Sequence, residues 1–305
     1  MITKGMDFLT LLDHGEEDIQ AILDLTKKMK SGIRGTPLKG RIIGLIFQKP
    51  STRTRVSSEV AVQQLGGSAI SLSWNELQLG RGETVADTGR VLSRYIDGVI
   101  ARVLRQSDLE EMAEHASIPV VNALSDLCHP LQALADLFTI WEAKHRLAGI
   151  KVAYVGDGNN VCNSLILACS RMGLHVSVAA PTGYEPDDRF TKEARKEADR
   201  HHTSFEILDS PTAAVKNADV VYTDVITSMG QEKEQEQRRR IFLPTFQVTS
   251  ELFRNASPSA IFMHPLPAHR GEEVTDEVID GHRSVVWEQA GNRLHTLKAL
   301  LQLIY

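Results

Sequence analysis

The amino-acid sequence predicts an α/β protein with two doubly wound domains, each with a mainly parallel sheet, and an active site in the interdomain cleft. Strand-like apolar runs alternate with helical patterns from end to end, which is typical of parallel sheets covered by helices on both faces. The 305 residues are enough for two domains of ordinary size. Polar residues follow several of the strands, where ligands of such sheets bind.

The first predicted domain covers residues 1–147. Apolar runs predict strands at 41–47, 68–72, 97–102 and 119–121. The intervening patterns predict helices at about 16–31, 53–65, 84–95 and 108–116, the second of which ends at Gly66-Gly67. A long helix at about 130–147 completes this series, and Ala148-Gly149 ends it.

The second predicted domain covers residues 148–290 and repeats the alternation. Its strands are predicted at 151–155, 174–180, 204–208, 219–223, 260–263 and 284–287. The charge run from Glu232 to Arg240 is more typical of a solvated helix than of a binding surface. A last amphipathic helix is predicted at about 291–304.

Bulk properties exclude several classes of function. The formal net charge of −5 gives no global attraction to nucleic acid or to an anionic membrane. No apolar run approaches the roughly 20 residues of a transmembrane helix, and the first residues lack the apolar core of a signal peptide. Three cysteines, Cys128, Cys162 and Cys169, have no metal-site spacing, so a reduced cytoplasm fits best.

The segment Ser51-Thr52-Arg53-Thr54-Arg55 carries the strongest chemical signal. It lies where a predicted strand passes, through Pro50, into a predicted helix. Unpaired backbone N–H groups and the helix dipole attract anions at a helix start, and hydroxyl and guanidinium groups add further donors. The pattern therefore predicts a site for phosphate or a similar dianion. The alternative is a serine cap with solvated arginines.

Several further motifs follow in a fixed order. They are Leu77-Gln78-Leu79-Gly80-Arg81-Gly82-Glu83-Thr84, His129-Pro130-Leu131-Gln132, Asp224 with Ser228-Met229-Gly230, His264-Pro265-Leu266-Pro267, and Asn292-Arg293-Leu294-His295. Together with Phe47 to Arg55, this set resembles the aspartate/ornithine carbamoyltransferase family over nearly the whole chain. The resemblance implies that segment 291–305 packs back on the first domain, that residues 1–147 bind carbamoyl phosphate, and that residues 148–290 bind the amino acid.

The resemblance also implies which residues hold carbamoyl phosphate. They are Ser51, Thr52, Arg53, Thr54, Gln78, Arg102, His129, Gln132, Leu266 and Arg293. In the family, His129 would meet the carbonyl oxygen of the carbamoyl group and Gln132 its amide. Gln78 would reach the site of a neighbouring subunit, which implies a homotrimer and leaves a larger assembly of trimers open. Arg55 is expected to be structural, paired with a carboxylate.

For the second substrate, the resemblance implies L-ornithine bound by Asn160, Asp224, Ser228 and Met229. An anionic side chain suits an ammonium group, and the segment lacks the basic residues that aspartate would need. The implied reaction carbamoylates the δ-amino group and gives L-citrulline and phosphate, in arginine biosynthesis or catabolism. The residues expected to act on the reacting groups are Arg102, His129, Gln132, Asp224 and Pro265.

The chemistry requires neither a metal nor an organic cofactor. Gly156-Asp157-Gly158-Asn159-Asn160 lacks the third glycine of a dinucleotide fingerprint, because Val161 occupies its place. The acidic residue expected about 20 positions later is also missing, which excludes a nicotinamide site. The pairs His201-His202 and His264 with His269 match no common zinc spacing.

One position departs from the ornithine branch of the family, which normally has His-Cys-Leu-Pro. Here Pro265 replaces that cysteine, as is typical of the aspartate branch. The change removes a polar group beside the attacking nitrogen, while Leu266 is expected to keep its carbonyl directed at that nitrogen, before a cis Leu-Pro bond. Three alternatives stay open: a slow enzyme for ornithine, an enzyme for aspartate, putrescine or an acylated ornithine, and a carbamoyl phosphate-binding paralogue without turnover.

Overall fold

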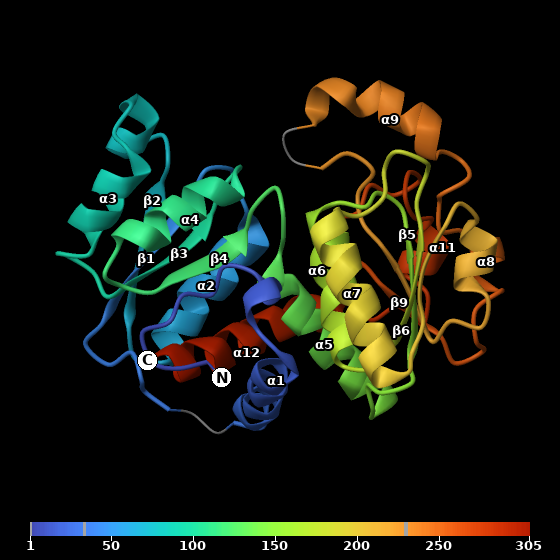
Figure 1. Cartoon of the computed structure of the whole chain (residues 1–305), viewed down its shortest axis with the longest axis horizontal. Coiled ribbons are helices and arrows are strands. Elements are labelled where there is room, and N and C mark those ends of the chain that lie inside the picture. The colour runs from blue at the N-terminus through green and yellow to red at the C-terminus, as the bar shows by residue number, and fades with distance from the viewer. Residues whose placement is uncertain (1, 33–34, 229–230) are drawn as a thin grey trace. The chain divides into compact units, whose positions relative to one another are not determined.

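The computed structural model describes residues 2–32, 35–228 and 231–305 (Figure 1). The chain divides into two compact units. Unit 1 comprises Met1–Ala135 and Asn292–Tyr305, and unit 2 comprises Asp136–Gly291. Two helices span the division: α5 (Pro130–Lys144) leaves unit 1 after Ala135, and α12 (Val286–Ile304) returns to it at Asn292.

Unit 1 is built on a four-stranded sheet in the order β2-β1-β3-β4, with all neighbours parallel. The strands are β1 (Ile42–Phe47), β2 (Ser68–Ser73), β3 (Gly98–Arg102) and β4 (Val120–Leu124). The helices are α1 (Glu16–Lys30), α2 (Thr52–Gln64), α3 (Val85–Leu92) and α4 (Gln106–His115), with short 3-10 turns η1 (Leu11–Asp13) and η2 (Gln78–Arg81). Continuous apolar runs such as Ile42–Phe47 suit these strands because both sheet faces are covered.

Unit 2 is built on a five-stranded parallel sheet in the order β7-β6-β5-β8-β9. The strands are β5 (Lys151–Val155), β6 (His175–Ala179), β7 (Phe205–Leu208), β8 (Val220–Thr223) and β9 (Ile261–Met263). The helices are α6 (Asn160–Arg171), α7 (Asp188–His201), α8 (Pro211–Val215), η3 (Glu232–Glu234), α9 (Gln235–Phe242), α10 (Ser250–Phe253) and α11 (Asp276–Ile279). Figure 1 shows α6 and α7 on one face of this sheet and α8 and α11 on the other.

The predicted fold class is confirmed: both sheets are parallel and carry helices on their faces. One predicted strand is wrong. Segment 284–287 pairs with β9 only through Ser284, and α12 begins at Val286. The backbone N–H of Val285 still donates to the Phe262 carbonyl, at 3.0 Å, so the extended pattern ends after two residues. The helix therefore starts five residues earlier than its predicted start at 291.

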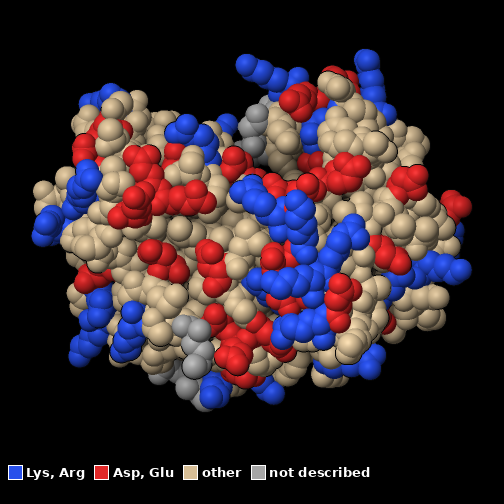
Figure 2. Space-filling model, viewed as in Figure 1, with Lys and Arg blue, Asp and Glu red and all other residues tan. Residues whose placement is uncertain are grey.

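The charged side chains of the surface and the apolar content of the helices can be compared with the bulk properties of the sequence. Figure 2 shows basic and acidic side chains interspersed over the visible face, with neither sign covering it alone. Among the described helices, none is both long enough and apolar enough to cross a membrane.

Candidate functional site

In unit 1, the ends of two neighbouring strands bring the predicted anion-binding residues together. Phe47 at the end of β1 is in register with Arg102 at the end of β3, so both strands finish at the same edge of the sheet. The chain then turns at Pro50 and enters α2, whose N-cap is Ser51. The Ser51 hydroxyl accepts from the backbone N–H of Thr54, at 3.4 Å. The first turn of α2 therefore lies beside Arg102.

Two arginines meet on one threonine in this place. Arg293 donates to the Thr54 hydroxyl at 3.0 Å and to the Gln132 side-chain oxygen at 3.1 Å. Arg102 lies 3.3 Å from the Ser51 hydroxyl and 3.5 Å from that of Thr54. We call Ser51, Thr54, Arg102, Gln132 and Arg293 the basic cluster. Two guanidinium groups held at one helix start favour a bound anion.

The remaining residues of the α2 start differ in exposure. Arg53 is half-buried and Thr52 is exposed, both in the first turn. Arg55 is exposed and pairs with Glu59 at 3.1 Å, which confirms the predicted carboxylate partner. A cavity of about 770 Å³ lies against this turn, and Ser51, Thr52 and Arg55 line it together with Ser71–Ser73 of β2.

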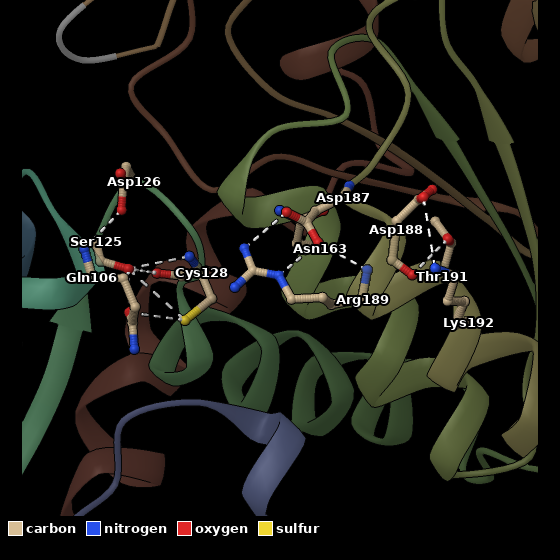
Figure 3. A network of polar contacts seen from close by, with 10 residues as sticks. All are labelled: Gln106, Ser125, Asp126, Cys128, Asn163, Asp187, Asp188, Arg189, Thr191 and Lys192. Carbon is tan, nitrogen blue, oxygen red and sulfur yellow. Dashed lines mark hydrogen bonds and ion pairs between the residues drawn. The ribbon is translucent and has the colours of Figure 1, made fainter. Parts of the chain in front are cut away.

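His129 lies just before α5 and is held by a turn that Gln106 secures. The Ser125 hydroxyl donates to the Gln106 side-chain oxygen at 2.6 Å, and it accepts from the Cys128 backbone N–H at 3.2 Å (Figure 3). Burial lowers the pKa of His129 well below its usual value, and the charges of Arg293 and Arg102 lower it further. The imidazole is therefore neutral near pH 7 and can donate one hydrogen bond without adding charge.

Gln78 lies on a separate segment of unit 1. Its side chain is exposed at the start of η2, whereas the next residue, Leu79, is buried and anchors the turn. Gly82 closes η2 with a φ of 99°, a left-handed conformation that favours glycine. Gln78 is thus presented outward, away from the packed interior of its own unit.

In unit 2, the carboxyl ends of β5 and β8 carry the second set of polar residues. Asn159 donates to the Asp224 carboxylate at 2.8 Å and to the Ser228 hydroxyl at 3.2 Å. Its side-chain oxygen caps α6, accepting from the backbone N–H groups of Val161 and Cys162 at 3.0 and 3.1 Å. We call Asn159, Asp224 and Ser228 the acidic cluster. Met229 lies outside the described residues.

Asn159 was not among the residues that the sequence singled out. The sequence indicated its neighbour Asn160, which is the first residue of α6 and is half-buried. The two adjacent asparagines at a strand-to-helix turn were the available signal, because asparagine is a preferred N-cap. The pattern could not tell which of the two would cap the helix and also reach Asp224.

The electrostatics of Asp224 differ from those of an exposed aspartate. Burial raises the pKa of Asp224, while His264 and the Asn159 hydrogen bond act in the opposite direction.

The turn after β5 requires glycine at position 158. A Cβ on Gly158 would lie 2.3 Å from the backbone of Glu185 and Pro186. The loop 181–187 therefore packs directly against the turn after β5. Asn163 braces the same loop by accepting from the backbone N–H of Asp187, at 2.9 Å (Figure 3).

The segment His264-Pro265-Leu266-Pro267 follows β9. His264 donates its backbone N–H to Gln289 at 2.9 Å, and its side-chain Nε2 lies 3.0 Å from Glu273. The backbone N–H of Leu266 donates to Nδ1 of His264 at 2.9 Å, so the ring proton belongs on Nε2. The Leu266–Pro267 bond is cis, as the family resemblance implies, and Leu266 has a φ of 58°. Pro265 is buried.

One group of side chains in the described part of unit 2 could approach a metal ion. His269, Glu272 and Glu273 each offer one ligand atom, and these atoms lie within 4.8 Å of one another. Glu272 is also paired with Arg239 at 3.4 Å, and one oxygen of Glu273 accepts from the His269 backbone N–H at 2.6 Å. Protein groups therefore already engage two of the three candidate ligands.

Comparisons with known proteins cover both units. Residues 6–142 match the model described as the carbamoyl-P binding domain of aspartate/ornithine carbamoyltransferase, and residues 148–304 match its Asp/Orn binding domain. An ornithine carbamoyltransferase of Pyrococcus abyssi is 55% identical over 305 residues, which cover 99% of this chain and 96% of that protein. That of Bacillus subtilis is 51% identical over 300 residues, 98% of this chain and 94% of that protein.

Solved structures of ornithine carbamoyltransferases are also similar to this chain over nearly its whole length. The ornithine carbamoyltransferase of Pyrococcus furiosus superposes with a TM-score of 0.94 at 55% identity, covering 99% of this chain and 97% of that one. The anabolic ornithine carbamoyltransferase of Campylobacter jejuni superposes with a TM-score of 0.93 at 40% identity, covering 97% and 98%.

Proposed function

The chain belongs to the aspartate/ornithine carbamoyltransferase family, and from that membership we propose its reaction. It transfers the carbamoyl group of carbamoyl phosphate to the δ-amino group of L-ornithine and releases L-citrulline and phosphate. The observation that carries the phosphate half is the meeting of Arg102 and Arg293 on Thr54 at the start of α2. The enzyme is a transferase of arginine metabolism.

The basic cluster binds the phosphate and stabilises it as a leaving group. Ser51, Thr52, Arg53 and Thr54 offer backbone N–H, hydroxyl and guanidinium donors at one helix start. Arg102 and Arg293 add two fixed charges whose forked donors suit phosphate oxygens. When the bond between the carbonyl carbon and the bridging phosphate oxygen breaks, negative charge grows on that oxygen. The donors of the basic cluster stabilise this charge in the transition state.

The carbamoyl group is held by His129 and Gln132. A neutral His129 donates from its protonated nitrogen to the carbonyl oxygen, where negative charge develops when the amine attacks. The side-chain oxygen of Gln132, positioned by Arg293, accepts from the carbamoyl amide. The carbonyl of Leu266 is directed at the attacking nitrogen. Removing one such oxyanion donor typically costs about 10²–10³ in kcat.

The amine substrate is bound by the acidic cluster together with Asn160 and Met229. The Asp224 carboxylate and the Ser228 hydroxyl recognise the α-amino group, and Asn159 fixes both of them. The δ-amine must be neutral and lie about 3 Å from the carbonyl carbon when it attacks. Pro265 lies beside the attacking nitrogen and contributes no proton-carrying group. No metal or organic cofactor takes part.

We propose that the two substrates bind in a fixed order. Carbamoyl phosphate binds first, ornithine follows, and closure of the site then excludes water from the reaction. We place the enzyme in the cytoplasm, because its three buried cysteines are free thiols. The C-terminal segment 291–305 belongs to the carbamoyl phosphate-binding domain, with domain limits at 1–147 and 148–290.

A homotrimer with shared active sites is part of this proposal. Its support is the outward presentation of Gln78, whose side chain is exposed on η2. Gln78→Ala and Arg102→Ala proteins are each expected to be inactive, and a mixture of them should regain part of the activity after subunit exchange. Mixed trimers that form and stay inactive would show that one chain supplies its whole site.

Citrulline production from the two substrates tests the reaction itself. The same assay with aspartate, putrescine and an acylated ornithine decides the amine, because Pro265 departs from the usual cysteine of the ornithine branch. Ornithine is expected to give the highest kcat/KM. Faster turnover of another amine would overturn the substrate, and carbamoyl phosphate binding without any turnover would overturn the reaction.

A further inference from the structure

Helix α9 carries a run of charged residues, and one of them is buried. Arg238 is 3% exposed, whereas Arg239 and Arg240 beside it are exposed. The sequence prediction of a solvated helix is therefore correct for Arg239 and Arg240 and wrong for Arg238. A buried guanidinium is costly unless several groups compensate it, so its contacts show what the burial achieves.

Arg238 contacts three separate segments of unit 2. Its Nε donates to the backbone carbonyl of Ile226 at 2.7 Å. Its Nη2 forms an ion pair with the Asp157 carboxylate, and Nη1 lies 3.7 Å from Glu234. The guanidinium carbon also lies 4.9 Å from the centre of the Tyr184 ring.

Two of these contacts lie on the segments that carry the acidic cluster. Ile226 lies midway between Asp224 and Ser228 in the chain, and Asp157 is two residues before Asn159. Tyr184 is tied to the same turn, because its carbonyl accepts from the Gly158 backbone N–H at 2.8 Å. Arg238 therefore joins the segment after β8 to the turn after β5, the two segments that carry Asp224, Ser228 and Asn159.

The planar fork of arginine fits this task. Nε of the guanidinium binds a carbonyl while Nη2 meets a carboxylate, and the flat face packs on an aromatic ring. Lysine has a single compact ammonium group and could not make both contacts with the same geometry. Arg238 of α9 thereby links the segment after β5 to the segment after β8.

We propose that Arg238 is a positioning residue for the amine substrate. It holds the 224–228 segment against the 157–159 turn, so that Asn159 can keep Asp224 and Ser228 in their binding positions. This inference rests on the proposed function, because it concerns the ornithine half of that site. Arg238 acts through Asp157 and the Ile226 carbonyl rather than by touching the substrate.

Steady-state kinetics of Arg238→Met, Arg238→Lys and the matched control Arg240→Met test the proposal. Arg238→Met is expected to raise the KM for ornithine at least about tenfold, since 1.4 kcal/mol of lost binding is tenfold. Carbamoyl phosphate affinity, measured by calorimetry, should change less than twofold in all three. Arg238→Lys should give an intermediate KM, and Arg240→Met should match the wild type.

A double-mutant cycle with Asp157→Asn separates positioning from general stability. If Arg238 acts through Asp157, the double variant should show a KM close to that of the worse single variant. An ornithine KM within twofold of wild type in Arg238→Met would overturn the proposal. So would equal losses for both substrates in parallel with a lower melting temperature, because that pattern reports loss of folded protein.

Hydrogen exchange provides a readout independent of turnover. In the free protein, Arg238→Met should speed exchange of the described amides around 224–228 at least about tenfold, and Arg240→Met should leave them unchanged. Unchanged exchange in Arg238→Met would overturn the proposal. If the wild type does not carbamoylate ornithine but exchange still rises in Arg238→Met, the proposed substrate fails while the holding role of Arg238 stands.

Discussion

The basic cluster in unit 1 and the acidic cluster in unit 2 differ in the sign of the charge that they concentrate. In unit 1, Arg102 and Arg293 are held together on Thr54, so positive charge is concentrated before any ligand binds. In unit 2, Asp224 is buried beside a second carboxylate, Asp157, and Arg238 pairs with Asp157. A bound anion reduces the repulsion between the two arginines of unit 1. In unit 2, the Asp224 carboxylate can bind a cationic group. We call the basic cluster and the acidic cluster the two half-sites. Each half-site is complementary in charge to the substrate proposed for it.

The first prediction breaks the basic cluster. Arg102→Met removes one guanidinium while keeping a side chain of similar length. Hydrogen bonds to charged groups contribute about 1.5–3 kcal/mol each, so losing two should weaken carbamoyl phosphate binding by roughly 10²–10⁴-fold. Calorimetric titration with carbamoyl phosphate measures this directly. The matched control is Arg105→Met, whose side chain is 71% exposed and pairs with Asp108 outside the cluster. An affinity within threefold of wild type in Arg102→Met would remove this residue from the phosphate site.

The second prediction breaks the acidic cluster and should leave the basic one intact. Asp224→Asn removes the negative charge with little change in shape, so kcat/KM for ornithine should fall by about 10–100-fold. Carbamoyl phosphate affinity should stay within twofold. Because burial raises the pKa of Asp224, its ionised form is unfavourable in the fold, and the melting temperature at pH 7 should not fall. Equal weakening of both substrates would contradict the division of roles.

The comparison also shows which parts of the molecule could be predicted from local sequence. Each cluster begins with signals confined to a few residues: Ser51 precedes a helix after an apolar strand, and Asp224 directly follows another apolar strand. Such strand ends and helix starts are set by short-range periodicity and capping, so the pattern indicates them. The two parallel sheets could be predicted for the same reason.

Long-range packing decided what the local pattern could not. Arg293 meets Thr54 although 239 positions separate them in the chain, and only the family resemblance indicated that both serve one ligand. Arg238 lies in a run of charged residues, and its burial depends on Asp157 and Tyr184 from other segments. The local charge pattern therefore predicted a solvated helix, whereas tertiary contacts bury Arg238.

The third prediction uses pH to separate the two half-sites, since burial shifts one titrating group of each in a different sense. In unit 1, the pKa of His129 lies well below its usual value, so this residue contributes stability above about pH 6.5 that is lost as the pH falls. In unit 2, burial raises the pKa of Asp157 to about 6, against the opposing effect of Arg238, with Asp224 and Glu234 raising it further. Asp157 therefore contributes stability at pH below about 4 that is lost as the pH rises through 6.

Melting temperatures of His129→Gln, Asp157→Asn and the wild type between pH 4 and 8 measure both effects. The stability advantage of the wild type over His129→Gln should shrink by a few degrees as the pH falls from 7 to 5. Its advantage over Asp157→Asn should shrink as the pH rises from 4 to 7. Two gaps that change in the same direction would show that burial does not control these groups as the structure indicates.

The last and smallest effect is expected at Pro265, where the acidic half-site departs from the usual pattern of the ornithine branch. Pro265→Cys restores a polar group beside the attacking amine and should raise kcat with ornithine by less than about tenfold. A general base typically contributes about 10²–10⁴-fold, and a smaller gain is expected here because the rest of this turn is already fixed. His264 accepts from the Leu266 backbone N–H at 2.9 Å and is itself held by Glu273 and Gln289, so the Leu266 carbonyl keeps its direction in either variant.

The gain should appear in kcat rather than in KM, because the thiol acts on the attacking nitrogen and Asp224 remains available for ground-state binding. The pH dependence of kcat should change at the same time, since the thiol alters how the neutral amine is supplied. Replacing proline loosens the unfolded chain and can cost about 0.4–1 kcal/mol, so rates must be referred to folded protein. Pro265→Ala is the matched control: it removes the ring without adding a thiol and should leave kcat unchanged. A cysteine variant with no gain, beside a wild type that carbamoylates another amine faster, would make Pro265 a determinant of a different substrate and would leave the basic cluster of unit 1 unaffected.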